Sequence, residues 1–177
     1  MGYAIAEVLA NQGARVHLVS GPTSLHTMHS EIYVKHVTSA EEMNNACTDI
    51  FPKTDIAVLA AAVADYKPAV KADQKIKKKD ETLSLELIKT PDIAAALGKL
   101  KSRNQFIVGF ALETENEIDN ARKKLESKNF DLIVLNSLND KGAGFGYDTN
   151  KISIIDRTHQ VYTFDLKSKK ELAEDIV

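Results

Sequence analysis

Apolar residues recur along the chain in two alternating patterns. Spacings of three and four, typical of one helix face, predict helices over residues 1–13, 39–51, 90–101, 114–128 and from 168 onward. Between them lie short apolar runs, most of them continuous, as in strands that are buried on both faces. These runs predict strands at 15–20, 32–37, 56–61, 83–88, 106–110, 132–136, 151–155 and 161–165. Strands that alternate with helices favour a mostly parallel sheet with helices on both faces, so we expect a Rossmann-like α/β fold with a C-terminal β-hairpin at 151–165.

The ends of the predicted helices carry their own signals. Three helices begin with the spacing of a capping box, a Ser or Thr three residues before a Glu, at Ser39, Thr114 and Ser168. Thr90–Pro91 predicts a helix that opens with proline at its first position, and Gly13 ends the first helix. That first helix starts without a residue to cap it, and we therefore expect an upstream strand and turn.

Composition narrows the class of protein. The chain of 177 residues is long enough for one domain, and it shows neither a signal peptide nor an apolar run near the roughly 20 residues that span a bilayer. A single cysteine, Cys47, is typical of a reducing compartment, so we expect a cytoplasmic protein. The formal net charge of −2 gives no general attraction to nucleic acid, so any anion site must be local. His26, His29 and Cys47 do not have the spacing of metal ligands, and we assign no protein-bound metal.

The strand at 56–61 runs into the stretch LAAAVADYKP, where side chains shrink to alanine before Asp65. Ligands of parallel sheets bind beyond the carboxyl ends of the strands, and alanines there let a flat ligand approach the backbone. Tight packing against a helix explains the alanines equally well. Asp65 can accept hydrogen bonds from a sugar or a base, or it can simply form a turn.

Further positions supply candidate anion contacts. Lys75 opens the run KIKKK, which indicates either a loop that closes over a polyanion or a solvated basic edge. Lys124 and Lys128 lie on one helix face, where they can clamp phosphates or complement the helix dipole. Residues 91–94 offer the backbone amides of a helix start, and Phe110 either stacks on a base or belongs to the core. All these positions lie at strand ends or helix starts, and this convergence favours one shared site.

Six segments match one family pattern in order and spacing, and together they are highly specific. They are MGYAIAEVLANQGARVHLVSGPTSL, AAAVADYKP, KIKK, KTPDIAAAL, VGFALET and NSLNDKGAGFGYDTNKISII. Over essentially its whole length the chain resembles the bacterial, CTP-dependent phosphopantothenate–cysteine ligase family. The resemblance implies a homodimer that uses CTP and Mg²⁺ to activate 4′-phosphopantothenate as an acyl-cytidylate, with release of pyrophosphate. Cysteine then attacks this intermediate to give 4′-phosphopantothenoylcysteine, a step of coenzyme A synthesis.

The resemblance also implies the site residues. Those that match the CTP site are Leu59, Ala60, Ala61, Asp65, Lys75, Pro91, Asp92, Ile93, Ala94, Phe110, Lys124 and Lys128. Lys75 matches the family's catalytic lysine, which lies on a flap. Asn136, Gly144, Phe145 and Asp148 match a loop near phosphopantothenate and the dimer contact, and the hairpin at 151–165 is the candidate for that contact.

The chain departs from the family at its start. The family's first strand and its Ser/Gly-rich phosphate loop precede the segment that matches Met1–Gly2, so we expect residues 1–177 to be one synthetase domain without them. Both a separate chain and a piece of a fusion with the flavin-dependent decarboxylase fit this expectation.

Two other functional classes fit the predicted fold. The main alternative is an NAD(P)-dependent oxidoreductase, but the strand VHLVSGP lacks the acidic residue that holds a ribose 2′-hydroxyl. Tyr66 also lacks a lysine four residues later, where Val70 stands. The other class is a nucleotide-binding module without catalytic activity.

Overall fold

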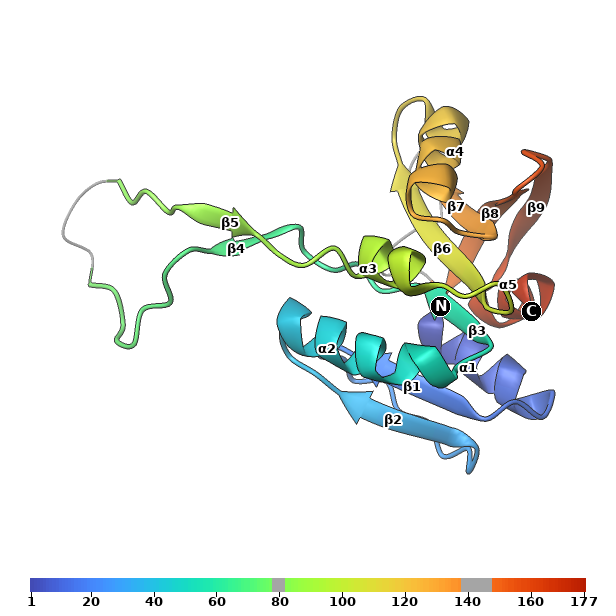
Figure 1. The fold of residues 1–177 in the computed structure, drawn as a ribbon, viewed down its shortest axis with the longest axis horizontal. Helices are drawn as coiled ribbons and strands as arrows, with labels where there is room; N and C mark the ends of the chain where they lie inside the picture. The colour runs from blue at the N-terminus through green and yellow to red at the C-terminus, as the bar shows by residue number, and fades with distance from the viewer. Residues whose placement is uncertain (78–81, 138–147) are drawn as a thin grey trace.

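The computed structural model describes residues 1–77, 82–137 and 148–177 (Figure 1). The helices are α1 (Gly2–Asn11), α2 (Ala40–Ile50), α3 (Ile93–Leu100), α4 (Glu117–Ser127) and α5 (Lys169–Ile176), with a short 3-10 helix η1 (Phe51–Lys53). The strands are β1 (Val16–Ser20), β2 (Ile32–His36), β3 (Ile56–Leu59), β4 (Tyr66–Pro68), β5 (Leu87–Lys89), β6 (Phe106–Glu113), β7 (Leu132–Ser137), β8 (Thr149–Asp156) and β9 (Val161–Ser168).

The central sheet has the order β3-β6-β7-β8-β9. β3, β6 and β7 are parallel, and β8 and β9 continue the sheet as the antiparallel hairpin that the sequence predicts at 151–165. β1 and β2 form a separate parallel pair. The Rossmann-like α/β class is therefore confirmed, with the antiparallel hairpin at one end of the parallel part.

Helices cover both faces of the central sheet, as the continuous apolar strands require (Figure 1). On one face, Val108, Val134 and Ile152 pack towards α1 and α5. On the other face, apolar residues of β6 and β7 pack against Leu97 of α3 and Leu125 of α4. None of the helices in the described residues combines the length and the apolar character needed to cross a bilayer.

Two of the three predicted capping boxes are confirmed, at Ser39 and Ser168. The third is wrong, because α4 begins after Asn116, whose φ of 46° places it in the left-handed region, and not after Thr114. The helix expected at Thr90–Pro91 also begins later. Its cap is Asp92, which accepts a hydrogen bond from the Ala95 N–H at 2.9 Å, so Pro91 lies before the helix and not at its first position.

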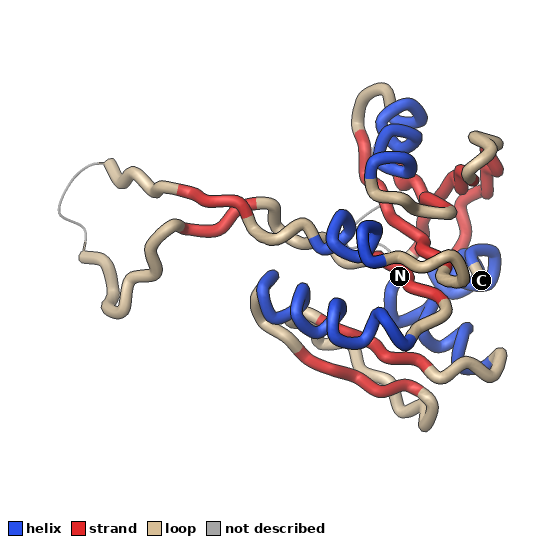
Figure 2. Tube along the Cα trace, in the orientation of Figure 1, coloured by secondary structure: helices blue, strands red, loops and turns tan. Residues whose placement is uncertain are grey.

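A long arm leaves the body between β3 and α3 (Figure 2). It contains the antiparallel pair β4–β5, in which Tyr66 is the partner of Lys89. The strand expected at 83–88 is wrong in extent, because β5 covers only Leu87–Lys89 and its side chains are exposed rather than half-buried. Alternation in this segment therefore does not mark a strand against the core.

Within the described residues, β1 and β3 each have one edge without a partner strand. β1 pairs with β2 alone, and β3 pairs with β6 alone. The upstream strand expected from the sequence stays a prediction.

Candidate active site

The central sheet has a step where β3 ends. Leu59, the last residue of β3, pairs with Gly109 of β6, and β6 then continues to Glu113 beside β7 only. The chain leaves the sheet through Ala60 and Ala61, whose small side chains leave the end of the strand open. Ala60 also faces the start of α1, since a Cβ added to Gly2 would lie 3.9 Å from the Ala60 Cβ. Packing against a helix therefore accounts for Ala60, and the approach of a flat ligand to the backbone stays a prediction.

Asp65 is fixed beside the segment that leads into α3. The Thr90 N–H donates to the Asp65 carbonyl at 2.9 Å, and the Thr90 hydroxyl donates to the Ala64 carbonyl at 2.6 Å. These two bonds join the two segments of the chain that form the base of the arm, one leading into β4 and the other following β5. They bring Asp65 next to Pro91 and the start of α3, although the residues are far apart in sequence.

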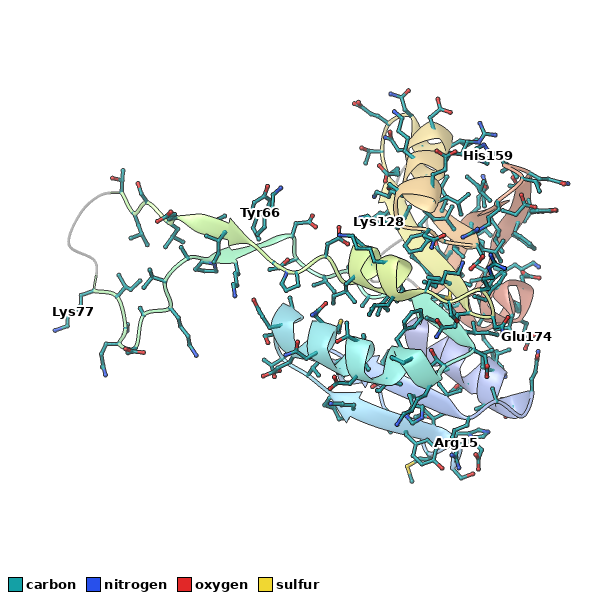
Figure 3. The ribbon with its side chains drawn as sticks, viewed as in Figure 1. Arg15, Tyr66, Lys77, Lys128, His159 and Glu174 are labelled. Carbon is teal, nitrogen blue, oxygen red and sulfur yellow. The ribbon has the colours of Figure 1, made fainter. Side chains whose placement is uncertain are left out.

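The start of α3 combines free amides with a fixed carboxylate. Asp92 caps the helix through Ala95, and no hydrogen bond from the amides of Ile93 and Ala94 is found among the described residues. Asp92 also forms an ion pair with Lys128, which extends from the end of α4 (Figure 3). Burial alone raises the pKa of Asp92, but hydrogen bonds from Lys128 and the Ala95 N–H, with the positive charges of Lys128 and Lys99, outweigh it and lower the pKa.

Lys124 pairs with a second acid, one that the sequence did not single out. Its Nζ lies 2.6 Å from Oε1 of Glu113, the last residue of β6, and the Glu113 side chain is 15% exposed. Lys124 of α4 and Lys128, which directly follows α4, therefore each contact a carboxylate. In this state their charges are compensated by Glu113 and Asp92, which any bound anion would have to replace or share.

Phe110 follows Gly109 at the step, but it is largely a core residue. It is half-buried and, like Val58, packs against the core on the face that α1 and α5 cover. The structure therefore supports the interpretation of Phe110 as a core residue, one position past Gly109, where the pairing of β3 with β6 ends.

The residues expected near the second substrate are only partly described. Asn136 lies near the end of β7, and its Oδ1 accepts a hydrogen bond from Nδ2 of Asn150 at 3.0 Å. Asp148 is exposed, and its carbonyl accepts a hydrogen bond from the Lys169 N–H at 2.9 Å. Gly144 and Phe145 lie outside the described residues.

Lys75 does not join the other candidate residues. It lies on the arm, in the segment between β4 and β5 and beyond the point where Lys67 forms an ion pair with Glu41 of α2. Figure 3 shows Lys77, two residues further on, at the far end of the arm from Lys128. Contacts thus join Asp65 to Thr90 and Asp92 to Lys128 within one chain, whereas Lys75 lies apart on the arm, and the expectation of a single pocket stays a prediction.

Two participants were missed from the sequence. Glu113 is an acid at the end of an apolar strand, and this position could have identified it as a candidate site residue from the sequence. Asn150 directly precedes the apolar run of β8. Nothing in the sequence pattern indicates that this polar residue is buried, with only 3% of its surface exposed. In the described part of the chain, no three His, Cys, Asp or Glu side chains are grouped as metal ligands.

Comparisons with known proteins identify the chain's relatives. The model of the family "DNA/pantothenate metabolism flavoprotein C-terminal domain" matches residues 1–177. A protein named cysteine/cysteine sulfinic acid decarboxylase, from an unknown prokaryotic organism, is 51% identical over all of this chain and 49% of its own length. The coenzyme A biosynthesis bifunctional protein CoaBC of Bacillus subtilis is 42% identical over all of this chain and 43% of its own length.

A solved structure agrees with these sequence matches. The C-terminal domain of a coenzyme A biosynthesis bifunctional protein CoaBC has a TM-score of 0.80 and 39% identity, covering 99% of this chain and 79% of that one. The chain spans about half the length of the curated relatives it matches. Neither the family description nor the CoaBC relatives give support to a nicotinamide-dependent oxidoreductase.

Proposed function

This chain belongs to the family of DNA/pantothenate metabolism flavoprotein C-terminal domains, and we propose that it is a CTP-dependent phosphopantothenate–cysteine ligase of the cytoplasm. Its products are 4′-phosphopantothenoylcysteine, CMP and pyrophosphate. Relatives named as coenzyme A biosynthesis proteins support this proposal, since two of them, from Bacillus subtilis and Haemophilus influenzae, are 42% and 43% identical over the whole chain.

One structural observation carries the proposal. Asp65, the start of α3, Lys124 and Lys128 come from separate segments that follow β3 or β6, and contacts join Asp65 to Thr90, Asp92 to Lys128 and Glu113 to Lys124. An open strand end, free helix amides and paired cations together suit a ligand with a flat base and several phosphates. The family membership makes CTP the expected ligand.

The reaction proceeds in two balanced steps. A carboxylate oxygen of phosphopantothenate attacks the α-phosphorus of CTP, and the bond from that phosphorus to the bridging oxygen breaks, so that pyrophosphate leaves with the electron pair. The amine of cysteine then attacks the carbonyl carbon of the acyl-cytidylate and loses a proton, and CMP leaves. Both steps develop negative charge on phosphate oxygens, which positioned cations and helix amides stabilise.

The residues at the step have distinct expected roles. The backbone of Leu59–Ala61 reads the edge of the cytosine, with Asp65 as its polar anchor. The amides at Ile93 and Ala94 face the nucleotide, and Phe110 closes the side of the site from the core. Lys124 and Lys128 contact the triphosphate, and each gives up part of its contact with Glu113 or Asp92 to do so. Their charge is needed because the carboxylate of phosphopantothenate and the triphosphate are both anions, which approach each other only when cations screen them.

Mg²⁺ is expected to arrive with CTP. The donor set at the site is two carboxylates, Glu113 and Asp92, each already paired with a lysine. Mg²⁺ usually binds through substrate phosphates with one or two protein carboxylates at most. These residues therefore fit a metal held chiefly by the triphosphate, where it would neutralise phosphate charge, and they do not form a metal site of their own.

Lys75 reaches a nucleotide site only if the arm enters a second molecule. The base of the arm is fixed to its own body by Thr90 and by the ion pair of Lys67 with Glu41. The arm also exposes apolar side chains, with Val70 81% and Leu83 66% exposed, and an isolated two-stranded hairpin is marginally stable in water. We therefore place Lys75 in the site of the partner chain of a homodimer, and the hairpin of β8 and β9 stays a second candidate for the dimer contact.

An assay of pyrophosphate release tests the proposal. CTP, 4′-phosphopantothenate and cysteine together should give pyrophosphate and 4′-phosphopantothenoylcysteine, and omission of phosphopantothenate should abolish release. ATP in place of CTP tests the choice of nucleotide. Lys75→Gln should sharply reduce product formation, with Lys71→Gln on the same arm as the matched control. No product with any nucleotide would overturn the proposal.

A second candidate comes from the relative named as a cysteine/cysteine sulfinic acid decarboxylase, which is 51% identical to this chain. This chain covers 49% of that protein, so the printed activity belongs to a longer molecule. Carbon dioxide release from cysteine or cysteine sulfinic acid, measured beside the pyrophosphate assay, separates the two activities.

A further inference from the structure

We infer that Asn150 is a positioning residue for the acyl substrate. It fixes the carboxamide of Asn136, and the Nδ2 group of Asn136 then donates to an oxygen of bound phosphopantothenate. The inference rests on the proposed function, which supplies the substrate. Nothing in the sequence pattern or in the family description assigns a role to Asn150.

The burial of Asn150 is the first observation. Its side chain belongs to a residue only 3% exposed, and among the described residues Ser20 is the other polar residue that is this well buried. A buried carboxamide is unfavourable unless its polar atoms are paired. Asn150 also lies at a register shift between β8 and β9, and such irregularities re-aim side chains. The sheet therefore deviates from regular pairing at the position where this carboxamide is turned inward.

The hydrogen bonds of Asn150 fix the polarity of its neighbour. The Lys151 backbone N–H can only donate, and it donates to Oδ1 of Asn150 at 3.0 Å. The other end of the carboxamide must then be the Nδ2 group, which donates to Oδ1 of Asn136 at 3.0 Å. A backbone N–H thus determines which end of Asn136 is the acceptor, and it leaves the Asn136 Nδ2 group as a donor.

Asn136 lies within reach of the nucleotide site. It pairs with Leu112 of β6, past the point where β3 ends, and Val134, two residues earlier, pairs with Phe110. Two residues along a strand and one strand across separate Asn136 from Phe110 by about 8 Å. This distance suits a substrate whose carboxylate meets the α-phosphate of a nucleotide held at the step.

The chemistry of the substrate matches a donor at this place. Phosphopantothenate carries carboxylate, amide carbonyl, hydroxyl and phosphate oxygens, all of which accept hydrogen bonds. A carboxamide locked by a buried neighbour is pre-organised and loses little freedom when the ligand binds. Because the proposed function assigns CTP to other residues, we expect the polarity of Asn136 to affect phosphopantothenate binding and to leave CTP binding largely unchanged.

Two substitutions of similar shape reverse that polarity. In Asn150→Asp, both carboxylate oxygens are acceptors, so Asn136 must turn and present Oδ1 to the ligand. In Asn136→Asp, the bond from Asn150 is kept but the donor to the ligand is lost. Ser153→Ala, on the same strand β8, is the matched control. The measurements are calorimetric titrations of phosphopantothenate and of CTP, with thermal unfolding of each variant.

We expect both Asp variants to bind phosphopantothenate at least tenfold more weakly, while their affinity for CTP stays within twofold of the wild type. A defect in Asn136→Asp with normal binding in Asn150→Asp would overturn the positioning role, as would an equal loss for both ligands. If Asn150→Asp fails to fold, the carboxamide ¹⁵N resonance of Asn136 in the wild type decides instead, since it must shift when phosphopantothenate is added. A wild-type protein that makes no phosphopantothenoylcysteine and binds no phosphopantothenate would overturn the proposed function and this inference together, whereas an active wild type with unaffected variants would overturn the inference alone.

Discussion

The ammonium nitrogen of Lys124 lies 2.6 Å from Oε1 of Glu113, so a helix cation and the carboxylate that ends β6 form one unit. The acid is largely buried, with its side chain 15% exposed, whereas the lysine is 48% exposed. The partner that can turn towards a ligand is therefore the lysine. Lys128 and Asp92 form a second pair, but there the acid, which caps α3, is the more exposed partner, at 54% against 25% for the lysine.

Lys124→Ala should separate stability from ligand binding. The substitution leaves the Glu113 carboxylate buried without its cation, which costs about 1–3 kcal/mol of unfolding free energy. It should also weaken CTP binding at least tenfold, because a phosphate contact is lost. The double variant Lys124→Ala with Glu113→Gln removes the unpaired charge, so it should recover most of the stability but none of the CTP affinity. Urea denaturation and calorimetry measure the two effects, and recovery of CTP binding in the double variant would contradict the assigned role.

Asp92 should make stability depend on pH in a defined direction. Its pKa is lowered in the folded protein, so the charged form contributes stability that is present above the ordinary Asp pKa of about 3.9 and is lost as the pH falls through the folded pKa. Asp92→Asn keeps a capping oxygen but removes the charge. The difference in unfolding free energy between wild type and Asp92→Asn should therefore be constant near neutral pH and shrink below about pH 4. A difference that grows on acidification would refute this account.

Gly98 should tolerate no side chain, although it lies in the interior of a helix. A Cβ there would lie 2.0 Å from the carbonyl oxygen of Lys128, where α3 packs against the end of α4. Alanine normally stabilises a helix by about 0.5–1 kcal/mol relative to glycine. Gly98→Ala should instead destabilise the protein and disturb the Lys128–Asp92 pair.

Gly2→Ala is the matched control for Gly98→Ala. Gly2 also lies in a helix, but a Cβ there would make only an ordinary contact with Ala60 at 3.9 Å. Thermal unfolding of the two variants should therefore give shifts of opposite sign, or a shift for Gly98→Ala alone. Equal shifts would show that close packing at Gly98 does not matter.

Much of the fold follows from the sequence because the body is built from strong local patterns. The apolar runs of β3, β6 and β7 and the capping boxes at Ser39 and Ser168 were predicted, since each depends on residues close in sequence. The start of α4 was not, because Asn116 adopts a left-handed conformation that the Thr114 pattern does not reveal.

The candidate site was predictable only in part. Strand ends and helix starts indicated that Asp65, the start of α3 and Lys128 lie near one another, and the Thr90–Asp65 and Asp92–Lys128 contacts agree with this, since parallel topology brings such ends together. The partners Glu113 and Asn150 depend on which side chains meet across the sheet, and spacing along the chain does not carry that information. A flap that carries Lys75 was expected from the resemblance, but its paired strands β4 and β5 were not predicted. The alternating residues at 83–88 predict a strand, but alternation does not indicate whether that strand packs against the core or extends away from it.

A mixture of two inactive variants should test whether Lys75 acts on a partner chain. Lys75→Gln removes the lysine of the arm, and Lys128→Ala damages the nucleotide site, so each homodimer should be nearly inactive. In a mixed dimer, the intact site of the Lys75→Gln chain receives Lys75 from the other chain. Random exchange of equal amounts makes half of the dimers mixed, each with one working site, so about a quarter of wild-type activity should return. If Lys75 served its own chain, every site in the mixture would lack one lysine and no activity would return, which would exclude the placement of the arm in a second molecule.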